Sequence, residues 1–202
     1  MKILSSLVLA ATLSLPALAQ SSAPAPAGRR NLLDIGTGQS LSGSGDYFCQ
    51  KTHLGYTRTL GRHFSVGPRL ALINGSKAVD FGPGVEVPTD YRALNLEAEA
   101  YYAPFGNDRR FVFALGAGAY AGHTKQHDFY YAGWGRNANN ELEFSYRPHN
   151  TKGFHVGYLA SVNADYAVDD QQRWLLGLKL ALQNDTYANI LPGAQLRLAR
   201  RF

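Results

Sequence analysis

The chain has 202 residues, of which 17% are charged and 12% are aromatic, with 21 glycines and a formal net charge of +5. Its 45% hydrophobic content excludes a disordered chain, and its single cysteine excludes an intrachain disulfide scaffold. Abundant glycine and aromatic residues with few charges disfavour a coiled coil, and the mild charge gives no indication of nucleic-acid binding.

The N-terminus has the pattern of a cleaved export signal. A short basic start is followed by an apolar run, and Ala17-Leu18-Ala19 supplies the small-x-small pattern that signal peptidases cleave. An uncleaved anchor helix is the alternative, which the shortness of the apolar run disfavours. We therefore predict a cleaved signal over residues 1–19, a flexible tail over 20–31 and one folded domain over 32–202.

The rest of the chain alternates between two kinds of residue with a period of two, which is typical of β-strands. In residues 174–183, for example, Trp and Leu alternate with Leu, Gly, Lys, Ala and Gln. The predicted strands cover residues 33–41, 51–60, 64–72, 94–102, 111–120, 154–163, 174–183 and 190–202. Each is about as long as a tilted strand that crosses a bilayer.

The connections between these strands alternate in length. Short turns are predicted at 61–63, 104–110 and 167–172, and longer loops at 42–46, 75–90, 122–150 and 184–189. Short turns at one rim and longer loops at the other are typical of outer-membrane barrels. The sequence therefore predicts an all-β fold, an eight-stranded antiparallel up-and-down transmembrane β-barrel. A soluble cup with its apolar face inward is the alternative.

The two faces of the predicted strands differ in chemistry. One is rich in Leu, Val, Phe and Ala, whereas the other combines Gly and Ala with charged residues. The charged residues assigned to this second face include Arg69, Glu97, Glu99, Lys179 and Arg197. An eight-stranded barrel is just wide enough for side chains to fill, so we expect these charges to pair across the lumen and to leave no open pore.

Large aromatic residues on the apolar face fall at the ends of strands. At the short-turn rim they are Phe64, Tyr102, Phe111, Trp174 and Phe202, and a looser set at the loop rim is Tyr91, Phe154 and Tyr187. Aromatic girdles mark the two membrane interfaces of transmembrane barrels. Together with the export signal, the first set favours a membrane barrel, with a periplasmic girdle at the short-turn rim.

With these features the chain resembles the small outer-membrane β-barrel family of the OmpA and OmpX type. The resemblance implies a monomer in the outer membrane of a Gram-negative bacterium, in contact with its lipids and inserted by the barrel assembly machinery. A C-terminal aromatic residue forms part of the assembly signal in that family. Phe202, Leu198 and Leu196 match this signal, whereas Arg200 departs from it. The chain leaves no room for the peptidoglycan-binding domain that OmpA carries.

Candidate catalytic and metal-binding residues are few. His155 and Ser161 share a face but lie about 20 Å apart along one strand, too far for a hydrolase triad. The His-x-Ser pattern of lipid A deacylases is absent. A metal site is conceivable at His123, His127, Asp128 and His149, although these residues fall in a predicted loop. No glycine-rich fragment opens a helix, so we predict neither a cofactor nor an enzyme.

The long loop 122–150 is the main functional candidate. Its aromatic residues include Phe129, Tyr130, Tyr131 and Trp134, and its flanks 125–131 and 141–146 could extend the strands as a hairpin. Rigid barrels usually place function in such loops. This favours a surface-contact segment for a partner, against a floppy loop that rests on lipid headgroups.

We therefore predict a structural or surface-interaction role, in envelope integrity or adhesion. The alternatives are a small channel for small or hydrophobic solutes and, less favoured, a lipid A-modifying enzyme.

Overall fold

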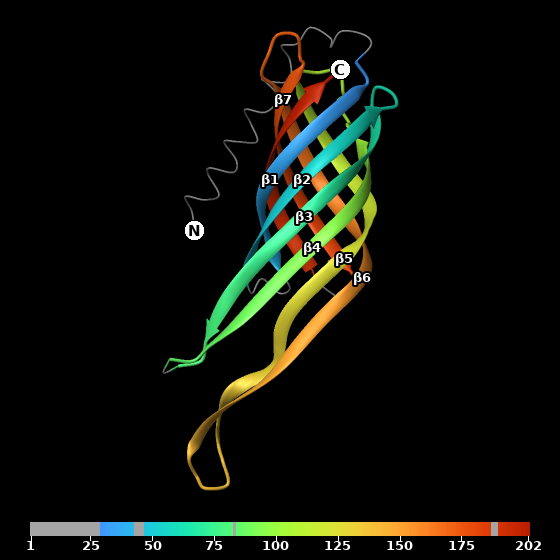
Figure 1. Ribbon diagram of the computed structural model, residues 1–202. Helices are drawn as coiled ribbons and strands as arrows, with labels where there is room; N and C mark the ends of the chain where they lie inside the picture. The colour runs from blue at the N-terminus through green and yellow to red at the C-terminus, as the bar shows by residue number, and fades with distance from the viewer. Residues whose placement is uncertain (1–28, 43–46, 83, 187–189) are drawn as a thin grey trace.

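The structure, a computed structural model, describes residues 29–42, 47–82, 84–186 and 190–202. In these residues the chain forms eight antiparallel strands that close into one barrel (Figure 1). The strands are β1 (Asn31–Ser42), β2 (Tyr47–Thr59), β3 (Phe64–Asp80), β4 (Glu86–Tyr102), β5 (Phe111–Arg136), β6 (Leu142–Ala167), β7 (Trp174–Asp185) and β8 (Ile190–Arg201). The predicted all-β, up-and-down, eight-stranded fold is confirmed.

The barrel closes where the first strand pairs with the last. β1 pairs with β8 from Leu32↔Arg201 to Ser40↔Gly193, and every other strand pairs with its neighbours in the sequence. At Gly38 the two strands approach so closely that an added Cβ would collide with the carbonyl oxygen of Ala194. Closure leaves no free edges in the barrel wall, so the backbone polar groups of the wall are paired.

Two of the predicted long loops are mostly strand. β5 and β6 have 26 residues each and pair along their whole length to Arg136↔Leu142. β3 and β4 continue in the same way to Asp80↔Glu86. The predicted loops 75–90 and 122–150 therefore reduce to residues 81–85 and 137–141. Both hairpins extend beyond the barrel at the end opposite the C-terminus (Figure 1).

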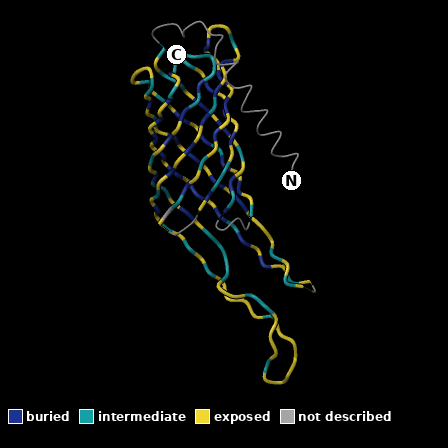
Figure 2. The backbone as a smooth tube through the Cα atoms, turned by 180° about the vertical axis from the view of Figure 1, so that it is seen from behind, coloured by how far each residue is buried: buried dark blue, intermediate teal, exposed yellow. Residues whose placement is uncertain are grey.

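Buried and exposed residues alternate along the barrel wall (Figure 2). The inward face carries polar and charged side chains, while large apolar side chains on the outward face stay exposed. One prediction about this alternation is wrong: Tyr91 lies on the inward face and is fully buried, so it does not belong to an outer girdle. Tyr187 and the predicted signal over 1–19 lie outside the described residues. No helix in the described part of the chain is long and apolar enough to span a membrane.

Candidate functional site

The centre of the lumen holds an ion cluster around Glu99. Its carboxylate accepts hydrogen bonds from Lys179 Nζ at 2.5 Å, Arg69 Nη1 at 3.1 Å and the Tyr101 hydroxyl at 2.8 Å, and another from the Ser161 hydroxyl. The side chains of Glu99, Lys179 and Arg69 are nearly inaccessible to solvent. These groups come from four strands, so the cluster joins opposite walls of the barrel.

A second cluster forms around Glu97, two residues away on the same face of β4. Lys51 Nζ lies 2.5 Å from its carboxylate, and the Gln183 amide donates to the same oxygen at 2.8 Å. Arg69 connects the two clusters, because its Nη1 also lies 3.6 Å from Glu97. Both carboxylates are therefore compensated by cations within the lumen, as buried charges must be.

A third group lies on the strands that close the barrel. Arg197 on β8 forms a bidentate ion pair with Asp165 on β6, and the Arg197 Nε–Asp165 Oδ1 distance is 2.7 Å. His53 on β2 lies 2.9 Å from Asp34 on β1. The five charged residues expected inside the barrel thus lie there, and the structure brings four of them, Arg69, Glu97, Glu99 and Lys179, into one network. Arg197 instead pairs with an acid that was not singled out from the sequence.

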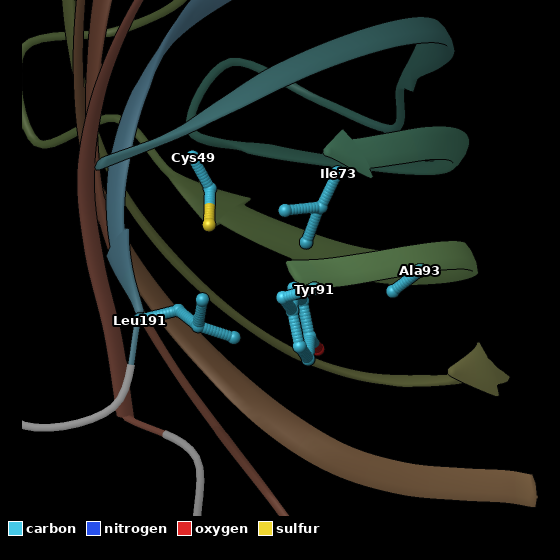
Figure 3. Packing of buried hydrophobic residues seen from close by; sticks show 5 residues of the cluster. All are labelled: Cys49, Ile73, Tyr91, Ala93 and Leu191. Carbon is cyan, nitrogen blue, oxygen red and sulfur yellow. The ribbon is translucent and has the colours of Figure 1, made fainter. Parts of the chain in front are cut away.

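Apolar clusters lie at both ends of this polar lumen. Near the loop end the cluster consists of Cys49, Ile73, Tyr91, Ala93 and Leu191 (Figure 3). At the short-turn end it consists of Tyr101, Ala103, Val112 and Ala114. A cavity of about 50 Å³ remains between the short-turn end and Arg197, enough for a few water molecules. The lumen is therefore filled along its length.

The five aromatic residues expected at the short-turn rim lie there, on or near the outer surface. The rings of Phe64 and Tyr102 pack with their centroids 5.2 Å apart. Arg200 is the residue that departs from the terminal pattern of the family. Its guanidinium lies 5.5 Å from the centre of the Trp174 ring, so it forms a cation–π contact at the rim. Phe111 is half-buried, and the exposed Phe202 exchanges two backbone hydrogen bonds with Asn31.

The projecting β5–β6 hairpin is joined to the shorter β3–β4 hairpin by an aromatic cluster. The ring of Phe81, at the β3–β4 tip, lies 5.5 Å from Phe129 and 5.7 Å from Phe144. Trp134 packs on Phe144 at 5.5 Å, and its indole N–H donates to the Phe81 carbonyl at 2.6 Å. The hairpin is therefore buttressed near the middle of its projecting part.

Tyr130 and Tyr131 of this hairpin are mostly exposed, and Trp134 keeps part of its ring exposed beside the cluster. Tyr130, Tyr131 and Trp134 are 68%, 53% and 40% exposed, whereas Phe129 is half-buried within the aromatic cluster. β6 pairs with β7 only from Gly157 onward, so among the described strands residues 142–155 of β6 present an unpaired edge on that side. The hairpin therefore offers exposed aromatic rings beside a free strand edge.

The candidate catalytic and metal-binding residues do not converge. Ser161 donates to Glu99, while His155 lies 2.7 Å from Asn95 and packs on Tyr120. Across the described residues, no three His, Cys, Asp or Glu side chains form a group that could hold a metal ion. Asp128 and His149 are register partners on β5 and β6, so this part of the predicted loop is strand.

Comparison with solved structures identifies the architecture. The attachment invasion locus protein Ail of Yersinia pestis matches in two crystal structures, one of them in complex with the heparin analogue sucrose octasulfate. For the complex, the TM-score is 0.53 at 12% identity; for Ail alone, it is 0.52 at 11%. Each match covers 86% of this chain and 99% of Ail. This chain has the fold of a small outer-membrane β-barrel.

A further match is the N-terminal β-barrel domain of Pseudomonas aeruginosa OprF, with a TM-score of 0.43 at 12% identity over 87% of this chain and all of that domain. Protein-family models give no match, and curated protein sequences give none either. The predicted resemblance is confirmed at the level of the fold.

Proposed function

We propose that the protein is an outer-membrane barrel of a Gram-negative bacterium that presents the β5–β6 hairpin to a partner at the cell surface. The membrane location is supported by the outward face of the barrel. Its exposed apolar residues include Leu33, Ile35, Leu54, Leu70, Leu72, Leu94, Leu96, Leu115, Val156, Leu176, Leu178, Leu180, Leu196 and Leu198. A soluble protein rarely exposes so large a contiguous apolar band, whereas lipid covers it without cost.

The orientation follows from the same layout. Bacterial outer-membrane barrels have short periplasmic turns and long extracellular loops. The short turns and the five rim aromatics therefore lie on the periplasmic side, and both hairpins project outside the cell. A cleaved signal over residues 1–19 and insertion by the assembly machinery, with Phe202 in the recognised terminal strand, complete the proposal.

The observation that carries the surface-contact role is the exposed aromatic surface on a buttressed hairpin. Tyr, Trp and Arg dominate the binding energy of protein interfaces. Tyr130, Tyr131 and Trp134 all lie on this hairpin, and Arg147 lies over the Tyr130 ring. The unpaired edge of β6 adds backbone donors and acceptors that a partner strand could use. We infer that the partner is a protein that adds a strand or packs its apolar residues on these rings.

The alternatives find less support. A channel needs a continuous water path, whereas charged side chains fill the middle of this lumen and apolar clusters lie at both ends. A lipid A-modifying enzyme needs converging catalytic groups, and His155 and Ser161 have different partners. We therefore assign the protein a structural and adhesive role without a cofactor.

The test is adhesion of bacteria that display the full chain. A double variant, Tyr130→Ala with Tyr131→Ala, should lose most binding, because hot-spot residues contribute about 2 kcal/mol or more each, and it leaves Trp134 in the buttressing cluster. The matched control is Glu141→Ala with Glu143→Ala, which changes two exposed residues of the same hairpin. Both proteins should still fractionate with the outer membrane and shift on gels when heated. Equal adhesion of the double tyrosine variant and wild type would overturn the contact role.

A further inference from the structure

Three basic side chains form a row across neighbouring strands on the outer face of the barrel. Arg92 on β4 is the register partner of Lys125 on β5, and Lys125 is in turn the partner of Lys152 on β6. All three are exposed. Directly opposed residues on adjacent strands lie about 5 Å apart at their Cα atoms, so three positive charges are held close together.

This arrangement is unfavourable unless an anion compensates it, because like charges directly opposite each other destabilise a sheet. The nearby acid is Asp90, whose carboxylate lies 3.9 Å from Arg92 Nε. Within the described residues neither Lys125 nor Lys152 forms an ion pair. Two of the three charges are therefore left for an external anion.

The row lies at the height expected for lipid headgroups. Arg92 lies ten residues along β4 from Tyr102 of the short-turn rim. At about 3.3 Å per residue and a tilt near 45°, this separation corresponds to about 23 Å along the barrel axis. The apolar band of outer-membrane barrels is about 25 Å tall, so Arg92 marks its extracellular border.

Below the row the surface is mostly apolar. The next outward residues toward the membrane include Leu72, Leu94 and Phe154, which are 55%, 47% and 68% exposed, with the exposed His123 of β5 between Leu94 and Phe154. A groove of about 490 Å³ joins the two levels, with Leu72 and Leu94 in its walls beside Arg92 and Lys125. One surface thus combines cations above with apolar side chains directly below, which matches the two parts of a lipid.

The charge is confined to one side of the barrel. At the loop ends of the remaining strands, the outward positions carry Gln39, Gln50, Asn74, Leu182 and Ile190, all exposed and uncharged. A general attraction to headgroups would not require cations on three adjacent strands and uncharged residues on the others. The asymmetry favours one bound lipid at a defined place.

We propose that the outer surface of β4, β5 and β6 binds a phosphate-bearing lipid of the outer leaflet. Arg92, Lys125 and Lys152 contact its phosphates, and its acyl chains pack against Leu94, Leu72 and Phe154. The inference rests on the proposed membrane location, but it is independent of the contact role of the hairpin tip. It names lipid phosphate as the ligand, and free phosphate lacks the acyl chains that the groove would hold.

The test is a lipid titration on the whole barrel in phosphatidylcholine nanodiscs, with bisphosphorylated lipid A as the probe and native mass spectrometry as the readout. The variant is Arg92→Gln with Lys125→Gln and Lys152→Gln. Because each basic residue near a membrane surface gives about a fivefold gain in affinity, the triple variant should bind on the order of 100-fold more weakly. Lys125→Gln alone should give about a fivefold loss, which provides a milder variant if the triple one does not fold.

The matched control is Arg58→Gln with Arg62→Gln and Arg173→Gln, which removes three exposed cations at the opposite rim. This control should retain the affinity for lipid A, and dephosphorylated lipid A or inorganic phosphate should bind the wild type poorly. Unchanged affinity in the triple variant, or equal binding of dephosphorylated lipid A, would overturn the lipid site alone. A chain that enters no bilayer would overturn the membrane location together with the site.

Discussion

Replacing Glu99 by Gln tests whether the lumen is held together by its ion network. The substitution keeps the shape of the side chain but removes the charge that faces Lys179 at 2.5 Å and Arg69 at 3.1 Å. Arg69 keeps a carboxylate of Glu97 at 3.6 Å, whereas Lys179 has Glu99 as its one acidic partner among the described residues. The loss of stability therefore comes mainly from Lys179, which is left buried without that acidic partner. Removing one partner of a buried pair costs about 3–5 kcal/mol, and we expect a loss of this size in the free energy of unfolding.

The assay is equilibrium unfolding by denaturant in lipid vesicles, followed by tryptophan fluorescence and by gel mobility of unheated samples. Lys179→Met should cost a similar amount, because it leaves Glu99 with one cation fewer. The double variant should recover most of the stability, since it removes both charges together. Additive losses in the double variant would show that the two groups are not coupled, and would refute the reasoning from the network.

Three other predictions concern closure, assembly and permeation. Gly38→Ala should destabilise the barrel by about 1–3 kcal/mol, because the added Cβ collides with the backbone of β8. The control Gly61→Ala should be tolerated, because no atom lies within 4 Å of its added Cβ. Equal unfolding midpoints for the two variants would contradict this prediction. Phe202→Ala should lower the amount of folded barrel in outer-membrane fractions several-fold, and undiminished amounts would rule out a role in assembly. Planar-bilayer recordings of the wild type should show no steady conductance, and large stable channels would disprove the filled lumen.

The architecture could be predicted because most strands of the barrel wall carry their own alternation. On β4, the side chains of Leu94 and Leu96 face outward and those of Glu97 and Glu99 face inward. This pattern depends only on neighbours in the sequence. Since the side-chain period of a strand is fixed at two, such a pattern assigns both faces of a strand at once. The closing of strands into a barrel then follows from their even number and short turns.

Partners across the lumen could not be predicted in the same way. Lys51 and His53 were not recognised as interior residues because the alternation of β2 is weak, with Thr on both of its faces. Asp165 on β6 pairs with Arg197 on β8, and Asp34 on β1 pairs with His53 on β2; the stagger between strands decides which of these groups meet. Sequence spacing carries no information about that stagger.

The long hairpin was difficult to predict for a different reason. Aromatic residues lie on both of its faces, so residues 128–149 show no clean alternation, and the register shifts between Phe129 and Tyr131. Its shape depends on Phe81, a residue from another hairpin, which packs against Phe129 and Phe144. This contact is tertiary and leaves no signal in the segment itself.

The ion network also has a consequence for the order in which the barrel can form. Lys51 on β2 forms an ion pair with Glu97 on β4 and donates a hydrogen bond to the Gln183 amide on β7, so its contacts are complete only when non-adjacent strands face each other. A partly built sheet exposes these groups to water, and their hydration opposes premature collapse of the curved wall. Pairing of β1 with β8 and dehydration of the interior must therefore occur as one cooperative step.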